Sequence, residues 1–178
     1  AGGVGARLWP VSRKSLPKQF CSLYDNQSLF QQTVERVSHR AFHTPMILTD
    51  NEYRFLVSDQ LAAINAHADI YLEPCGKNTA PAVIAAALIA EKKHENAVVA
   101  VLPADHHVSD KQDFINTLIT AIKYAEAGKL VTFGVKPNRA ETGYGYIEVK
   151  KRSCEGALEV VTFHEKPDPV SANEYFKS

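Results

Sequence analysis

Residues 2–20, GGVGARLWPVSRKSLPKQF, form the stretch around which we expect the rest of the chain to be organised. Three glycines in four positions allow positive φ angles, and they let the backbone approach a ligand with no Cβ in the way. Successive backbone N–H groups in such a turn make a concave site for anionic oxygens. Basic side chains follow, and both arginine and lysine bind phosphate. The stretch therefore predicts a polyphosphate-binding loop with candidate contacts from Gly2, Gly3, Gly5, Arg7, Arg13 and Lys18.

The spacing disfavours the two commonest phosphate-binding loops. A Walker A loop requires G-x-x-x-x-G-K-[ST], and no lysine followed by serine or threonine stands at that distance after a glycine. The dinucleotide fingerprint G-x-G-x-x-G requires a third glycine where this chain has Leu8. A glycine-rich surface turn with incidental basic residues is the alternative interpretation.

Helix starts are marked by capping residues. Ser28 and Gln31 have the spacing of a capping box, and Ser109 with Gln112 has the same spacing. Gly128 is expected to end the second of these helices at its C′ position. The predicted helices are 28–39, 51–66, 80–90 and the segment from Ser109 to Gly128, and the predicted strands are 45–49, 69–73, 97–102 and 130–135.

The alternation of these elements predicts the fold class. The run 97–102 is apolar throughout, which is typical of a central parallel strand covered on both faces. The apolar helix 80–90 is expected to be buried against that sheet. We therefore expect a three-layer α/β/α, Rossmann-like fold with a mostly parallel sheet.

After residue 135 the alternation stops. The runs 144–149 and 158–163 are strand-like with no helix between them, and they predict a small β-ribbon extension that covers the substrate. A helix is expected to begin at 169–177. The chain opens on Ala1 inside a motif, without the strand that normally precedes such a loop. We expect residues 1–178 to form a single, incomplete domain of a longer protein.

Asp105 is the candidate metal ligand. It follows the most apolar strand directly, and ligands of open α/β sheets bind beyond the carboxyl ends of the strands. A carboxylate that faces a triphosphate there suits Mg²⁺, although aspartate after a strand also commonly caps a turn. The neighbouring His106 and His107 are interpreted as structural, because adjacent residues of an extended chain point in opposite directions.

Five ordered motifs resemble the sugar-1-phosphate nucleotidyltransferases, and within that family its mannose-1-phosphate guanylyltransferase branch. The resemblance implies that GTP and mannose 1-phosphate give GDP-mannose and pyrophosphate. A relative specific for another base or hexose, and a non-catalytic regulatory relative, are the alternatives. The motifs lie at 2–20, 73–82, 102–106, 141–147 and 165–167.

The resemblance also assigns roles to residues. Arg7 and Lys18 would hold the triphosphate, Asp105 would hold Mg²⁺, and Lys166 would hold the sugar phosphate. Without the resemblance, the Glu165–Lys166 pair would be an exposed ion pair and the glycines near it a strand bend. The further nucleotide contacts would be Gly2, Gly3, Gly5, Arg13, Gln19, Asn78, Thr79 and Pro81, and the sugar contacts Gly143, Tyr144, Gly145, Glu165 and Lys166.

The family carries a further metal-binding aspartate after the 165–167 motif, and no aspartate lies beyond Asp168 in this chain. We therefore expect residues 1–178 alone to bind GTP but to make little product.

Composition limits the partners. Lys+Arg and Asp+Glu both number 20, so no net field recruits nucleic acid or a membrane surface, and no apolar run is long enough for a membrane span. The 3 cysteines are scattered without metal spacing, as in a reduced cytoplasmic protein. A homo-oligomer is compatible with this composition.

Overall fold

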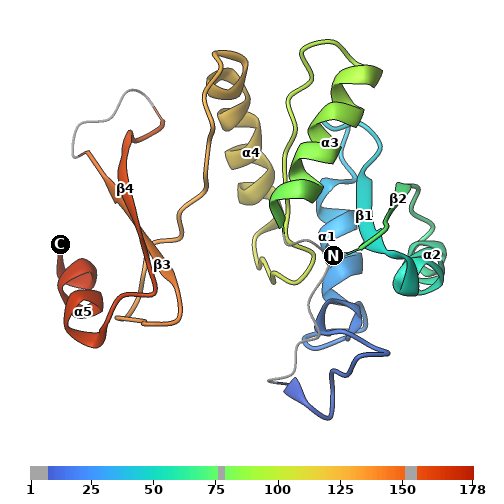
Figure 1. Cartoon of the computed structure of the whole chain (residues 1–178), viewed down its shortest axis with the longest axis horizontal. Helices are drawn as coiled ribbons and strands as arrows, with labels where there is room; N and C mark the ends of the chain where they lie inside the picture. Colours follow the sequence, from blue (N-terminus) through green and yellow to red (C-terminus); the bar gives the residue numbers. More distant parts are fainter. Residues whose placement is uncertain (1–7, 76–78, 151–155) are drawn as a thin grey trace. The chain divides into compact units, whose positions relative to one another are not determined.

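The computed structural model describes residues 8–75, 79–150 and 156–178 (Figure 1). The chain divides into two compact units, residues 1–119 and residues 120–178, and each is described by itself. That residues 1–178 form one domain stays a prediction.

The first unit contains a parallel strand pair. Strands β1 (Met46–Asp50) and β2 (Asp69–Glu73) pair from Met46 with Asp69 to Asp50 with Glu73. The crossover between them consists of a short 3-10 helix η3 (Asn51–Tyr53) and helix α2 (Arg54–Ala63). The Asp50 side chain caps the crossover by accepting a hydrogen bond from the Glu52 amide at 2.9 Å. Both strands and the crossover helix were predicted within a few residues of these bounds.

Helix α1 (Leu29–Val37) carries the capping box that the sequence predicts. The Ser28 hydroxyl accepts the Gln31 amide at 3.1 Å, and the Gln31 side chain accepts the Ser28 amide at 3.0 Å. Its apolar face packs in one core with the short 3-10 helix η2 (Lys18–Phe20), strand β1 and helix α2. The buried core residues are Phe20, Phe30, Val34, Ile47, Val57 and Leu61.

Helix α3 (Thr79–Lys93) is more exposed than its apolar sequence predicts. Ala86 and Ala90 are buried, whereas Ile84 and Leu88 are 60 % and 56 % exposed. The sequence indicated burial against a sheet, and the strands expected to form that sheet are not all present among the described residues.

The segments 97–102 and 130–135 are not strands in the described structure, which corrects the prediction. Val98 and Val101 are 43 % and 50 % exposed, so the first of these segments is not covered on both faces. An apolar run indicates that a segment favours burial, but a strand also needs a neighbouring ladder of hydrogen bonds, which the run itself does not specify.

Helix α4 (Lys111–Glu126) begins one residue later than its predicted cap implies. The Asp113 amide donates to the Asp110 carboxylate at 2.8 Å, so Asp110 rather than Ser109 caps the helix. A carboxylate accepts this hydrogen bond and also favours the positive end of the helix dipole. Gly128 ends the helix with φ of +76°, as the sequence predicts.

The second unit contains the predicted β-ribbon. Strands β3 (Gly145–Val149) and β4 (Val160–Glu165) pair in antiparallel fashion. Helix α5 (Pro169–Lys177) follows, capped by Asp168, whose carboxylate accepts the Val170 amide at 2.9 Å. The centres of the His164 ring on β4 and the Tyr175 ring on α5 are 4.7 Å apart. This contact packs α5 against the ribbon. Figure 1 shows the crossed strands with α5 beside them.

In the parts of the chain that the structure describes, every helix is too short or too polar to cross a membrane.

Candidate functional site

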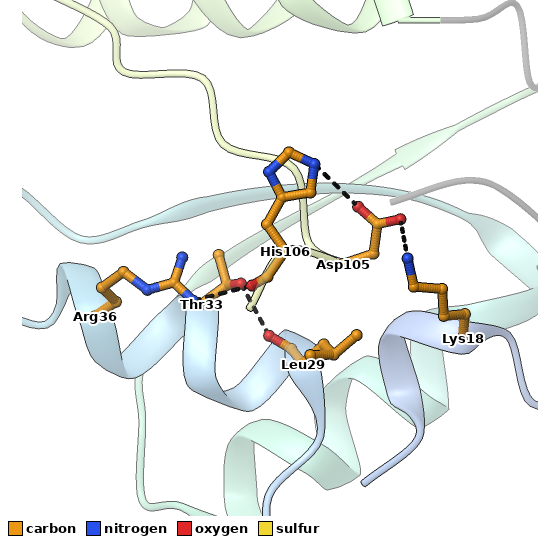
Figure 2. A network of polar contacts seen from close by, with 6 residues as sticks. All are labelled: Lys18, Leu29, Thr33, Arg36, Asp105 and His106. Atoms are coloured by element: carbon orange, nitrogen blue, oxygen red, sulfur yellow. Dashed lines mark hydrogen bonds and ion pairs between the residues drawn. The ribbon is translucent and has the colours of Figure 1, made fainter. Parts of the chain in front are cut away.

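The first unit brings two of the predicted catalytic residues together. The Lys18 ammonium lies 3.2 Å from a carboxylate oxygen of Asp105, although 87 positions separate them in the chain. Lys18 comes from η2, and Asp105 comes from the loop that follows residues 97–102 (Figure 2). Their side chains are 34 % and 43 % exposed, so both remain open to a ligand. A cation and a carboxylate in this position can serve a triphosphate and its metal ion.

A network of polar side chains fixes η2. The Gln60 amide of α2 donates to the Phe20 carbonyl at 2.9 Å, at the end of η2. The Ser28 hydroxyl donates to the Gln60 side chain at 2.6 Å, and the Gln31 side chain donates to the Gln60 carbonyl at 2.9 Å. The capping box of α1 therefore also anchors, through Gln60, the short helix that carries Lys18.

A second polar contact holds the loop that carries Asp105. The Arg36 guanidinium of α1 donates to the His106 carbonyl at 3.1 Å, as Figure 2 shows. Arg36 is only 4 % exposed, and this burial lowers the pKa of its guanidinium from the ordinary value. The His106 ring lies 4.0 Å from the other carboxylate oxygen of Asp105. The His106 side chain is 66 % exposed, and its structural role stays a prediction.

Arg13 and Gln19 occupy different environments. Arg13 is exposed, and its backbone pairs with Leu16 through hydrogen bonds of 3.0 and 2.9 Å that close a tight turn. Gln19 is only 4 % exposed, so contact with a nucleotide base stays a prediction for it. The turn forms one wall of an open hollow of about 590 Å³ lined by Arg13, Lys14, Ser15, Glu52, Tyr53 and Leu56.

Thr79 and Pro81 lie in the first turn of α3, and both are exposed. Proline is well accommodated there because the first-turn amides have no partner within the helix. Five further predicted contacts lie outside the described residues: Gly2, Gly3, Gly5, Arg7 and Asn78.

The second unit gathers the predicted sugar contacts at one end of the ribbon. Gly145 and Glu165 are ladder partners, and the Lys166 amide donates to the Tyr144 carbonyl at 3.2 Å. The Lys166 ammonium lies 3.0 Å from the Glu165 carboxylate, and both side chains are exposed. Lys166 has a φ of +43°, an uncommon left-handed conformation for a residue with a side chain. Strained backbone of this kind often occurs at functional positions.

Two neighbours of this cluster were not among the predicted sugar contacts, although Glu141 lies within the 141–147 motif. Glu141 accepts the Gly143 amide at 3.2 Å, and this hydrogen bond lowers the pKa of the Glu141 carboxyl. The Phe163 ring lies against Gly145, where an added Cβ would overlap the ring. A side chain at position 145 would therefore require the Phe163 ring to move.

The sequence model of the nucleotidyl transferase family matches residues 1–178. The chain belongs to the nucleotidyl transferase family. It is 45 % identical over 184 residues to a mannose-1-phosphate guanylyltransferase of Escherichia coli, covering 99 % of this chain and 40 % of that protein. It is also 45 % identical over 180 residues to the alginate biosynthesis protein AlgA of Pseudomonas aeruginosa, covering 98 % of this chain and 37 % of that protein. The chain thus spans about two fifths of the length of these relatives.

Solved structures confirm the fold class of this nucleotidyl transferase. A crystal structure named mannose-1-phosphate geranyltransferase, from Thermus thermophilus, matches with a TM-score of 0.84 and 34 % identity. The match covers 99 % of this chain and 51 % of that chain. A structure named mannose-6-phosphate isomerase, from Helicobacter pylori, matches with a TM-score of 0.74 and 32 % identity over 90 % of this chain and 61 % of that one. The α/β, Rossmann-like class predicted from the sequence is correct.

Nucleotidyl transferases generally use a divalent metal ion. Within residues 8–75, 79–150 and 156–178, no group of three or more His, Cys, Asp or Glu side chains could hold a metal. Asp105 nevertheless suits a hard cation, because its carboxylate is partly exposed and oxygen is the preferred ligand. Mg²⁺ commonly uses one or two carboxylates together with water and substrate phosphates. The donor set therefore fits a metal ion that arrives with a nucleotide.

Proposed function

We propose that the full-length protein transfers the guanylyl group of GTP to mannose 1-phosphate, giving GDP-mannose and pyrophosphate. The observation that supports this proposal is the 3.2 Å contact between Lys18, for which we propose phosphate binding, and Asp105, for which we propose metal binding. The choice of GTP and mannose 1-phosphate is supported by the names of the guanylyltransferase relatives.

The reaction requires no covalent nucleophile from the protein. A phosphate oxygen of mannose 1-phosphate attacks the α-phosphorus of GTP, and the bond from that phosphorus to the oxygen of the pyrophosphate leaving group breaks. Catalysis then consists of positioning the reactants and neutralising their charge. In this proposal Lys18 contacts the triphosphate together with Arg7 and the glycine loop, and Gln19, Thr79 and Pro81 lie near the base with Asn78.

Mg²⁺ is the metal ion that we propose for Asp105. When bound, it would neutralise the phosphate oxygens and orient them. In the described structure the Lys18 ammonium contacts the Asp105 carboxylate. In a Mg²⁺–nucleotide complex, phosphate oxygens would be alternative partners for that ammonium. With such a complex bound, Asp105 would hold the metal ion and Lys18 would contact the phosphate oxygens.

We propose that the cluster in the second unit binds the sugar phosphate. The exposed Lys166 ammonium provides a charge for the phosphate, and the Glu165 carboxylate can accept hydrogen bonds from sugar hydroxyls. Gly143 and Gly145 expose backbone beside the Tyr144 ring, which is 68 % exposed and offers a flat apolar surface to a hexose.

We also propose a cytoplasmic location. Cys21 and Cys75 are both free thiols, as expected for a chain in a reducing compartment. Whether the protein forms a homo-oligomer is a separate question that gel filtration with light scattering answers.

A substrate panel tests the proposed function. The full-length protein is supplied with pyrophosphate, Mg²⁺ and, in turn, GDP-mannose, GDP-glucose, ADP-glucose, UDP-glucose or dTDP-glucose, and nucleoside triphosphate release is measured. We expect GDP-mannose to give the highest kcat/KM. Preference for another base or hexose would reject the assignment while retaining the reaction type, and failure with every substrate would reject the reaction.

A further inference from the structure

Arg36 is an unusual residue for the interior of the first unit. It lies in the last turn of α1 at only 4 % exposure, although arginine is seldom buried unless it is paired. Among the residues that the structure describes, no carboxylate forms an ion pair with it. Its guanidinium instead lies 5.2 Å from the centre of the Phe114 ring and donates to the His106 carbonyl. A buried guanidinium thus binds a backbone carbonyl in residues 103–109, the loop that carries Asp105.

That carbonyl belongs to the peptide group between His106 and His107, one residue after Asp105. Residues 103–109 form neither a helix nor a strand, so their position depends on side-chain contacts rather than on a backbone ladder. The Arg36 bond of 3.1 Å holds the His106 carbonyl, and the residue before His106 in the chain is Asp105. Gln32, one turn earlier on α1, contacts the His107 ring at 3.3 Å and restrains the following residue.

The other end of α1 anchors Lys18. Ser28 and Gln31 at the start of the helix hold Gln60, and Gln60 holds the Phe20 carbonyl at the end of η2. One short helix therefore connects to both members of the Lys18–Asp105 pair, with Arg36 as the contact on the Asp105 side.

We propose that Arg36 is a positioning residue for the metal–nucleotide site. By holding the His106 carbonyl against α1, it fixes the loop that carries the Asp105 carboxylate and keeps that carboxylate facing Lys18. The inference rests on the proposed function for its ligand, and it extends that function to a residue with no contact to the substrates.

The test uses two variants of the full-length protein. Arg36→Met keeps the length and apolar stem of the side chain but removes the guanidinium donors, and Arg36→Lys keeps a cationic donor. Mn²⁺ stands in for Mg²⁺, because both prefer oxygen ligands in octahedral geometry. Mn²⁺ binding in the presence of GTP is measured by electron paramagnetic resonance, alongside kcat and KM for GDP-mannose synthesis.

The matched control is Arg54→Met on α2. Arg54 also donates a side-chain hydrogen bond, to Asn51 at 2.6 Å, and also lies over an aromatic ring, that of Phe55 at 4.3 Å. Both of these partners lie on the β1–β2 crossover rather than on the Asp105 loop, so Arg54→Met should match the wild type in Mn²⁺ binding and in kcat.

For Arg36→Met we expect Mn²⁺ binding with GTP to weaken by about tenfold or more, the scale seen when a metal ligand loses its supporting hydrogen bond. We expect kcat to fall by about a hundredfold, as for an ångström of misplacement, with an unchanged KM for mannose 1-phosphate. Arg36→Lys should lie between Arg36→Met and the wild type. If Arg36→Met does not fold, Arg36→Lys is compared with the wild type instead.

A purely structural role predicts a different pattern. Arg36→Met would then lower the melting temperature while the folded protein kept wild-type Mn²⁺ affinity and kcat, and that result would overturn the proposal. A wild-type protein that binds Mn²⁺ with GTP but makes no GDP-mannose would reject the proposed function instead. In that case the ratio of Mn²⁺ affinities between wild type and Arg36→Met still decides the role of Arg36.

Discussion

The Lys18 ammonium lies 3.2 Å from the Asp105 carboxylate, so two motifs at distant positions in the chain meet in one polar contact. We propose different roles for the two side chains, so substituting each should have a different effect. Lys18→Ala in the full-length protein should lower kcat by about 10²–10³, the scale of losing one preorganised charge contact to a transition state. The far-UV circular dichroism spectrum should not change, because Lys18 supports no part of the core.

Lys93→Ala is the control for this substitution, because Lys93 also forms an ion pair, with Asp69, away from the site. Its kcat should equal that of the wild type. If Lys18→Ala keeps wild-type turnover, Lys18 has no part in the reaction.

Asp105→Asn should change the metal dependence rather than the fold. The amide keeps the shape of the side chain but loses the charge that holds a hard cation. Removing a hydrogen-bond partner of a metal ligand lowers metal affinity by roughly 10–100-fold. Changing the ligand itself should raise the Mg²⁺ concentration for half-maximal rate by at least this factor. Titration of the rate with Mg²⁺ measures this, and Asp59→Asn on the exposed face of α2 is the control. An unaltered Mg²⁺ profile would leave Asp105 as a turn residue.

Gln60→Leu should destabilise the first unit and, through η2, the position of Lys18. The substitution removes the acceptor of the Ser28 hydroxyl and the donor to the Phe20 carbonyl. Leaving such partly buried groups unpaired costs about 1–3 kcal/mol. Urea unfolding measures the change. Gln112→Leu, which removes one exposed hydrogen bond to Asn116, should alter stability by less than about 0.5 kcal/mol. Equal effects for both variants would contradict the anchoring role of Gln60.

Gly145→Ala tests the packing of the ribbon in the second unit. The new methyl group would overlap the Phe163 ring, and the ring, which is 58 % exposed, would have to move toward solvent. Overpacking of a buried core costs about 1–3 kcal/mol, and we expect the lower end of that range because the ring is exposed. In a Phe163→Ala background the same substitution should be nearly neutral, because the obstructing ring is gone. Thermal unfolding of the four proteins gives the coupling, and additive effects would show that the overlap is not the cause.

Local patterns in the sequence were sufficient for much of the fold. The capping box of Ser28 and Gln31 and the left-handed Gly128 depend on neighbouring residues alone, and the structure confirms both. The ribbon strands β3 and β4 were likewise predicted within two residues. Segment 97–102 was predicted wrongly as a strand, because its apolar run carries no information about the partner that must supply its ladder.

The candidate site was predictable where its residues lie in short motifs. The glycine-rich and acidic motifs identified Lys18 and Asp105, and the structure brings them together. Arg36 and Gln60 were missed, because their importance lies in contacts to the His106 and Phe20 carbonyls that no short motif encodes. One signal was available for Arg36: it lies seven positions after the buried Leu29, on the same face of a helix.

The most direct test of the central claim is a ³¹P NMR measurement on the full-length protein with GTP, mannose 1-phosphate and Mg²⁺. We expect the resonances of GDP-mannose and pyrophosphate to grow in equal amounts while those of GTP and mannose 1-phosphate decline, and Lys18→Ala to abolish most of this change. Release of orthophosphate with GDP, or no consumption of mannose 1-phosphate, would contradict guanylyl transfer at the site of Lys18 and Asp105.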